Sequence, residues 1–282
     1  LLEYPPAARA GTWGWGRDGQ LGHSEASATP RRVLGPLQHA ACRSVACGHH
    51  ATCALTRDGD AFIWGALTGG DRGGSGAELA SPTFELPDSS VAGSAIERVA
   101  LPPQACIAIA VGGKHALATL TDGRLCAWGS GQHGQLGLGD PHERAHPEHI
   151  ATLAHVTAAS CGESHSAALA ISSLPSAASS DPRGGMSTVW VWGRSQYSSG
   201  GVGSTAGRPL PRALPLPADV GACELRTIHC GYHHAACLTA DGRLLCWATA
   251  HEAAGGEGAT PTMSVLTPPA GSRYVVLACG GF

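Results

Sequence analysis

The chain has 282 residues, a formal net charge of −3 at pH 7 and 43% hydrophobic residues. That length fits one large all-β domain, and the near-neutral charge excludes the strongly basic surface of proteins that bind nucleic acid directly. No apolar run is long enough to span a membrane, and the first residues lack the charged start and apolar core of a signal peptide. We therefore expect one domain over residues 1–282, in the cytoplasm or nucleus, with its eleven cysteines reduced.

A tryptophan recurs five times along the chain, and in each copy a glycine stands nine residues later. A fixed internal period is typical of repeat architectures, in which each unit needs its neighbours to bury its apolar faces. The remaining tryptophans, Trp15 and Trp190, lie outside the period, and all seven are expected to serve packing. The five pairs are Trp13 with Gly22, Trp64 with Gly73, Trp128 with Gly137, Trp192 with Gly201, and Trp247 with Gly256.

A second repeated glycine lies upstream of the tryptophan and follows a small or apolar residue. In four copies a histidine comes shortly after this glycine. Between this glycine and the tryptophan, three copies carry an Asp-Gly pair flanked by alternating apolar residues, which predicts a hairpin with positive φ at glycine. A proline opens a further apolar segment after each glycine-rich loop, so each period supplies about four short strands. The glycines are Gly48, Gly112, Gly162, Gly231 and Gly280, the histidines His50, His115, His165 and His234, and the turns Asp58-Gly59, Asp122-Gly123 and Asp241-Gly242.

The segments ACGHHATCALTRDGDAFIWG and WGSGQHGQLGLGD resemble the repeat of the regulator of chromosome condensation family. The resemblance extends from Gly11 to Gly281, and the GQLG motif appears at Gly19–Gly22 and Gly134–Gly137, whereas the other glycine-rich loops lack Gln-Leu. It implies a β-propeller, in that family commonly of seven blades. The chain holds about five blades' worth of repeats of about 50 to 65 residues, and its ragged ends favour a fragment of a longer protein.

Motifs that could carry chemistry are better explained by the repeat. GWGRDG and GSGQHG match the dinucleotide fingerprint, but the residues that follow cannot begin the required helix. Cysteine and histidine lack the close paired spacing of zinc sites, and no GxSxG nucleophile motif is present. We expect no cofactor, no metal and no catalytic residues, so the chain is predicted not to be an enzyme.

The function that the sequence favours is a protein-interaction module, or scaffold, that presents loops to a protein partner. The alternative, implied by the family resemblance, is a guanine nucleotide exchange factor for a small GTPase; neither direct nucleic-acid nor membrane binding is expected. Two insertions exceed the repeat, at Leu86 to Ala105 and at Ser172 to Ser187. The first, which carries Glu97 and Arg98, is the candidate partner-binding segment.

Overall fold

The computed structural model describes residues 9–16, 18–23, 26–67, 96–102, 105–172, 186–194, 208–220, 223–248 and 263–280. Within these ranges the fold is all-β, with one short 3-10 helix, η1 (Gly35–Leu37), and no helix that could cross a membrane. We number the sheets as blades 1 to 5. Blade 1 has β1 (Gly11–Gly14) and β2 (Ser27–Arg32); blade 2 has β3 (Cys42–Cys47), β4 (Ala51–Thr56), β5 (Ala61–Gly65) and β6 (Glu97–Arg98); blade 3 has β7 (Cys106–Val111), β8 (His115–Leu120), β9 (Leu125–Gly129) and β10 (Arg144–His149); blade 4 has β11 (Val156–Cys161), β12 (His165–Ser172), β13 (Met186–Gly193) and β14 (Arg208–Leu214); blade 5 has β15 (Leu225–Cys230), β16 (His234–Thr239), β17 (Leu244–Ala248) and β18 (Ser264–Leu266).

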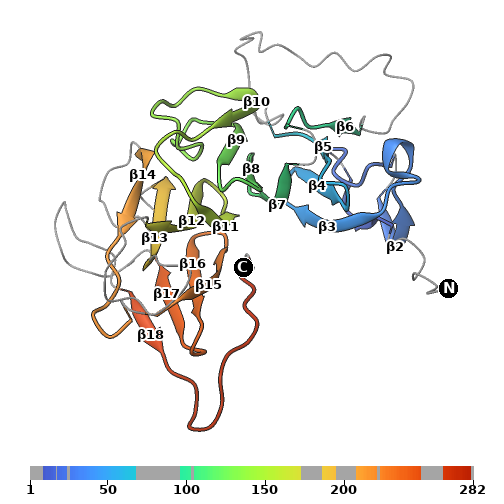
Figure 1. Ribbon diagram of the computed structural model, residues 1–282. Coiled ribbons are helices and arrows are strands. Elements are labelled where there is room, and N and C mark those ends of the chain that lie inside the picture. Colours follow the sequence, from blue (N-terminus) through green and yellow to red (C-terminus); the bar gives the residue numbers. More distant parts are fainter. Residues whose placement is uncertain are drawn as a thin grey trace, which may run out of the picture.

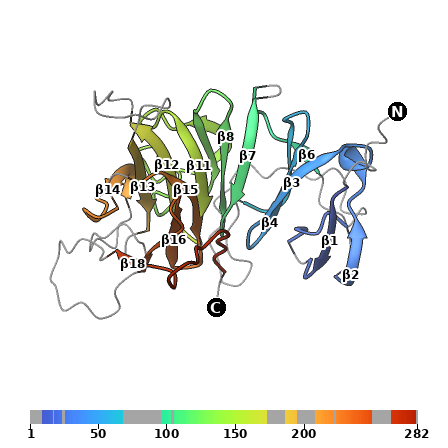
Figure 2. The ribbon, with the colours of Figure 1, turned by 60° about the horizontal axis from the view of Figure 1, so that its bottom comes forward.

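Each of blades 2 to 5 is an antiparallel meander in which the strands pair in chain order. The blades follow one another around an arc, with their first strands on the inside (Figure 1). A view turned by 60° shows neighbouring blades stacked face to face (Figure 2). The predicted β-propeller is confirmed, with four complete blades and the two-stranded blade 1.

The Asp-Gly pairs form the turns between the second and third strands. Gly59, Gly123 and Gly242 have φ of 82°, 79° and 87°, which confirms the predicted positive φ. A side chain resists this backbone region, whereas glycine enters it freely. The corresponding connection of blade 4 lies outside the described residues.

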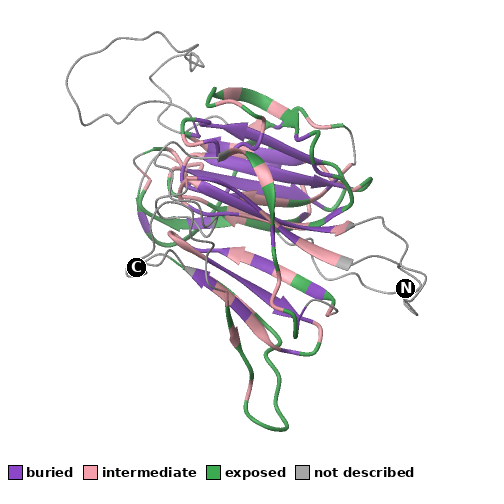
Figure 3. Ribbon diagram, turned by 90° about the vertical axis from the view of Figure 1, so that its left-hand side faces the viewer, coloured by how far each residue is buried: buried purple, intermediate pink, exposed green. Residues whose placement is uncertain are grey.

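Buried residues concentrate in the middle strands of the stacked blades, and exposed residues lie mainly on outer strands and connections (Figure 3). Strands β4 and β8 are buried along their whole length. Both are rich in alanine, because a strand between two blades has little room for large side chains.

Three cysteines at the repeat mark bond to the blade that precedes them in the chain. The thiols of Cys161, Cys230 and Cys279 donate to backbone carbonyls of the preceding blade, at 3.6, 3.6 and 3.5 Å. Burial raises the pKa of Cys230 to about 12. These cysteines therefore act as neutral spacers rather than as nucleophiles.

Candidate binding face

The two ends of the propeller carry different connections. We call loop face the end formed by the loops between first and second strands (residues 48–50, 112–114, 162–164 and 231–233) and by the glycine-rich loops after the third strands. We call turn face the opposite end, formed by the Asp-Gly turns and the connections between blades. The antiparallel order of the strands places these connections on opposite ends.

Each described GQLG motif fastens a glycine-rich loop to the tryptophan of the next blade. In blade 3, the carbonyl of Gln135 accepts from the indole of Trp192 and from the hydroxyl of Ser166, both at 2.8 Å. In blade 1, the carbonyl of Gln20 does the same for Trp64 and Thr52 of blade 2, again at 2.8 Å. A carbonyl has two lone pairs, so one oxygen satisfies both buried donors.

The glycine that ends this motif lets the indole approach. A Cβ at Gly137 would lie 2.8 Å from the indole nitrogen of Trp192, and a Cβ at Gly22 would lie 3.2 Å from that of Trp64. The glycine nine residues after one tryptophan thus packs on the tryptophan of the following blade. Gly73, Gly201 and Gly256 lie outside the described residues.

Hydroxyl residues occur where the preceding loop has Gln-Leu. Thr52 and Ser166 follow such loops, whereas Ala116 and Ala235 occupy the same strand position after loops without Gln-Leu. The pattern fits the hydrogen bonds, because a hydroxyl buried here needs the Gln carbonyl as its acceptor.

Buried histidines begin the second strands of blades 3 and 4. His115 Nε2 lies 2.8 Å from Ser166 Oγ. Because the Ser166 hydroxyl already donates to Gln135, the imidazole is the donor, and its other nitrogen, Nδ1, has no hydrogen-bond partner among the residues that the structure describes. Burial lowers the pKa of His115 to about 3 and that of His165 to about 4, so both rings are neutral at pH 7.

The grouping of His50 with His115, His165 and His234 is wrong. The second strand of blade 2 begins at Ala51, so Ala51 takes the position of these histidines and His50 belongs to the loop before it. One residue separates Gly48 from His50, whereas two residues separate Gly112 from His115. His50 therefore lies one position too early to match His115.

Rings and carboxylates from several blades meet on the loop face. His50 Nδ1 of blade 2 lies 2.9 Å from Asp18 Oδ2 of blade 1, and His49 Nδ1 lies 3.3 Å from Glu163 Oε2 of blade 4. The ring of His49 also contacts Tyr232 of blade 5, with centroids 5.6 Å apart. Side chains of non-neighbouring blades therefore touch across the end of the propeller axis.

Two further histidines border this group. The pKa of His133 is lowered by burial and then by the charge of Arg194, and Glu163 opposes the shift. Burial is also the main cause that lowers the pKa of His233. As for His133, the charge of Glu163 raises this pKa and the charge of Arg194 lowers it. The face thus carries neutral rings at pH 7 between groups of both charges.

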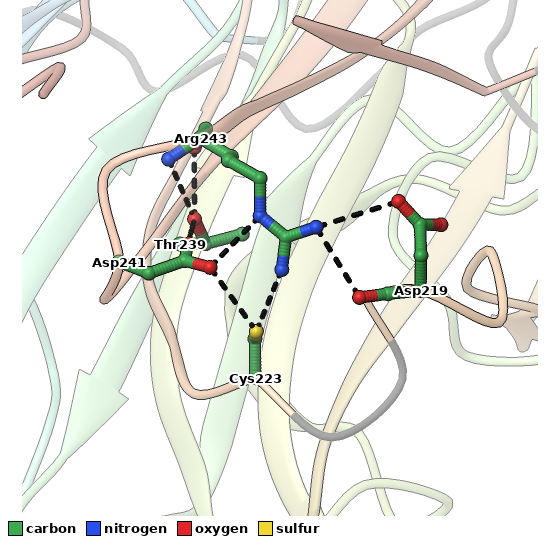
Figure 4. A network of polar contacts seen from close by, with 5 residues as sticks. All are labelled: Asp219, Cys223, Thr239, Asp241 and Arg243. Carbon is green, nitrogen blue, oxygen red and sulfur yellow. Dashed lines mark hydrogen bonds and ion pairs between the residues drawn. The ribbon is translucent and has the colours of Figure 1, made fainter. Parts of the chain in front are cut away.

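The turn face holds a polar network around Arg243 (Figure 4). The guanidinium bonds to Asp241 at 2.8 Å, to Asp219 at 3.4 Å and to the thiol of Cys223 at 2.8 Å. Its side chain is only 17% exposed. We interpret the network as a clamp that holds the connection entering blade 5, because every charged group in it is paired.

Of the predicted residues of the first insertion, the structure places Glu97, Arg98 and Ala105 in the blade framework. Glu97 and Arg98 form β6, the fourth strand of blade 2, and Arg98 Nη2 pairs with Asp60 Oδ1 at 2.5 Å. The carbonyl of Ala105 accepts from the backbone of Thr121. Leu86 lies outside the described residues.

The repeat tryptophans differ in burial. Trp64, Trp128, Trp192 and Trp247 are 1 to 4% exposed and pair with the second residue of the adjacent strand. Trp13 is 60% exposed, because β1 has no described strand on its inner side. No group of three metal-binding side chains occurs among the described residues.

Comparison with known proteins gives a consistent family. The model of the regulator of chromosome condensation (RCC1) repeat matches residues 12–55, 122–169 and 187–238, and a second model of that repeat matches residues 106–135. The ultraviolet-B receptor UVR8 of Arabidopsis thaliana is 29% identical over 238 residues, which cover 83% of this chain and 47% of that protein. Human E3 ubiquitin-protein ligase HERC2 is 28% identical over 281 residues, 95% of this chain but 5% of that protein.

Solved structures share the fold. The structure of Prp20p from Saccharomyces cerevisiae matches with a TM-score of 0.67 and 21% identity, over 95% of this chain and 63% of that chain. Human WBSCR16 matches with a TM-score of 0.65 and 21% identity, over 95% of this chain and 64% of that chain. This chain therefore spans less than two thirds of each of these proteins.

Proposed function

Because the chain belongs to the family of regulator of chromosome condensation repeat proteins, we propose that it is a protein-binding module that receives its partner on the loop face. The observation that carries the proposal is the meeting of His49, Glu163 and Tyr232, from three blades, at one partly exposed place. Loops on a rigid frame are where recognition residues commonly lie. Neighbouring groups on the turn face, by contrast, are held in the Arg243 clamp.

A site-specific cross-linker tests this proposal. A photoreactive phenylalanine analogue replaces His49 on the loop face or, in the control, Arg124 on the turn face. We expect a saturable cross-linked product of one defined mass from position 49 and not from position 124. Equal labelling from both positions, or a product from position 124 alone, contradicts the loop face as the binding surface.

A second candidate function is nucleotide exchange on a small GTPase. The support is the fold shared with Prp20p, whose structure was described together with its binding to Gsp1p and histones. The purified chain would then accelerate release of fluorescent GDP from Gsp1p. An unchanged rate at chain concentrations that saturate any binding would reject exchange activity and leave the binding module standing.

The insertion from Leu86 to Ala105 remains a proposed recognition segment of either function. A deletion of residues 86–95 removes no residue of β6 and neither Arg98 nor Asp60, which pair with each other. If the segment binds the partner, this deletion abolishes the cross-link or the exchange rate without lowering the melting temperature. Retention of both activities would exclude it.

A further inference from the structure

Four rings form a row across the end of the propeller axis on the loop face. His50, His49, Tyr232 and His233 follow one another with centroid distances of 5.4, 5.6 and 4.4 Å, each edge to face. The first two rings belong to blade 2 and the last two to blade 5. We call these four residues the ring row.

Carboxylates lie against the two rings of blade 2. Asp18 contacts His50 and Glu163 contacts His49, at 2.9 and 3.3 Å. Glu163 reaches this place across blade 3, since a Cβ at Gly113 would lie 2.5 Å from Glu163 Oε2. The glycine therefore opens the path by which a carboxylate of blade 4 meets a ring of blade 2.

The groups in this contact remain accessible. The side chain of His49 is 55% exposed and that of Glu163 is 23% exposed. A ring that is more than half exposed is held by few neighbours, so a cation from outside can take its place beside the carboxylate. Other charged groups on this face are Arg194, which acts on His133 and His233, and Lys114 in the loop of blade 3.

We propose that the ring row is the seat of a basic side chain, lysine or arginine, on the partner, and that this cation pairs with Glu163. The inference rests on the proposed function and adds the chemistry of the partner. Ring faces attract cations, and an adjoining carboxylate supplies a charged hydrogen bond. His49 holds Glu163 in position until the incoming cation replaces it.

The test uses two labelled peptides, one of alternating arginine and glycine and one of alternating glutamate and glycine. Binding is followed by fluorescence anisotropy at pH 7.5 with the whole chain. We expect the arginine peptide to bind and Glu163→Gln to weaken it about tenfold, as the loss of one charged hydrogen bond does. Tyr232→Leu also weakens it, through the lost ring face.

Asp122→Asn is the matched control, because it removes the same unit of charge from the turn face, where Asp122 pairs with Arg124. Binding of the arginine peptide by this variant should equal that of the unmodified chain, and thermal melting verifies that all three variants are folded. Equal weakening by Glu163→Gln and Asp122→Asn would overturn the proposal, since it would reveal attraction by net charge alone.

The choice between the two peptides gives an independent readout. Binding of the glutamate peptide in its place, or no arginine-peptide binding at any accessible concentration, would overturn the seat. The cross-link from position 49 can also be measured in the Glu163→Gln variant. If it persists there, the partner still binds the loop face but does not depend on a cation paired with Glu163, so the binding module stands and the cation seat is rejected.

Discussion

At the scale of single residues, the atoms close to the Cα of each repeat glycine decide whether a larger residue could replace it. Gly137 and Gly139 both have positive φ, of 73° and 96°. A Cβ at Gly137 would press on the Trp192 indole at 2.8 Å, whereas a Cβ at Gly139 would meet the side chain of Leu210 at an ordinary 3.5 Å. Alanine at either position would carry the strain of positive φ, but only alanine at position 137 would also crowd the indole. Comparing the two substitutions therefore separates the cost of backbone strain from the cost of crowding.

We predict that Gly137→Ala lowers the free energy of unfolding more than Gly139→Ala. Both variants carry the cost of positive φ, on the order of 1 kcal/mol, and Gly137→Ala adds about 1–3 kcal/mol for overpacking. Urea denaturation measures the difference. Equal losses would mean that the loop moves away from Trp192 without cost.

Position 166 and its counterpart 235 provide a second residue-level test. His115 Nε2 has Ser166 as its partner, whereas His165 Nε2 has none within the described ranges, and Ala235 stands at the corresponding place in blade 5. Ser166→Ala should destabilise by about 1–3 kcal/mol, because it leaves a buried nitrogen unpaired. Ala235→Ser should not stabilise the chain, because the loop before blade 5 lacks the Gln-Leu whose carbonyl accepts from Ser166 in blade 4. The same denaturation measures the effect, and a stabilised Ala235→Ser chain would contradict this pattern.

At the scale of elements, the glycine-rich loop and the next blade are joined through an indole. Trp192 donates to the Gln135 carbonyl, whereas Trp247 Nε1 has no hydrogen-bond partner among the described residues. Both side chains are almost fully buried, at 2% and 1% exposed. A comparison of Trp192 with Trp247 therefore measures the contribution of the hydrogen bond at nearly equal burial of the side chain.

Trp192→Phe should lower the free energy of unfolding by about 1 kcal/mol more than Trp247→Phe. Removal of the indole nitrogen costs a hydrogen bond in blade 4, while in blade 5 it removes a polar atom that has no partner in the described part of the chain. Equilibrium unfolding followed by circular dichroism compares the two variants. A larger loss for Trp247→Phe would contradict the assigned bond.

The strands and turns could be predicted from the sequence, but the contacts between blades could not. Alternation around Asp122-Gly123 and the recurring tryptophan predicted the strands and turns, because these depend on local periodicity. His50 shares its residue type with His115 but not its position in the repeat. Counting forward from Gly48 or back from Trp64 gives Ala51 as the counterpart of His115.

The candidate site was harder to predict because it is assembled from distant blades. Glu163 meets His49 only because the curvature of the arc brings blade 4 across Gly113. No spacing within one repeat encodes that contact. The pairing of Gln-Leu loops with Thr52 and Ser166 does leave a signal in the sequence, but it appears only when each loop is compared with the following repeat.

At the scale of the whole molecule, buried neutral histidines make stability depend on pH. The pKa of His115 is lowered to about 3 and that of His165 to about 4, from an ordinary 6.5. The unfolded chain therefore binds more protons than the folded chain between these values and 6.5. Folding stability is complete above pH 6.5 and decreases as the pH falls.

We expect the free energy of unfolding to fall by about 1.4 kcal/mol per pH unit for each of these two rings below pH 6. Urea denaturation at pH 7.5, 6 and 5 measures the slope. In the variant His115→Gln with His165→Gln the slope should be smaller, even though the variant is less stable at pH 7.5. An unchanged slope would assign the pH dependence to other groups.

Thiol reactivity reports on the packing of the whole arc. All eleven cysteines are free; Cys47 is exposed, and burial raises the pKa of Cys106 to about 11 and of Cys237 to about 12. Titration with a thiol reagent at pH 8 should label Cys47 rapidly and these two only after denaturation. Rapid labelling of Cys237 in the native chain would indicate that blade 5 opens.

The carbonyl of Gln135 stabilises Trp192, which belongs to the next blade, and Gln20 stabilises Trp64 in the same way. Each of these two contacts is a seam between the loop of one repeat and the inner half of the next repeat. A repeat transplanted within the propeller, or copied during gene duplication, keeps its strands but exchanges its seam partners. Compatibility between loop and successor, rather than the stability of a blade alone, then limits which repeats can stand next to each other.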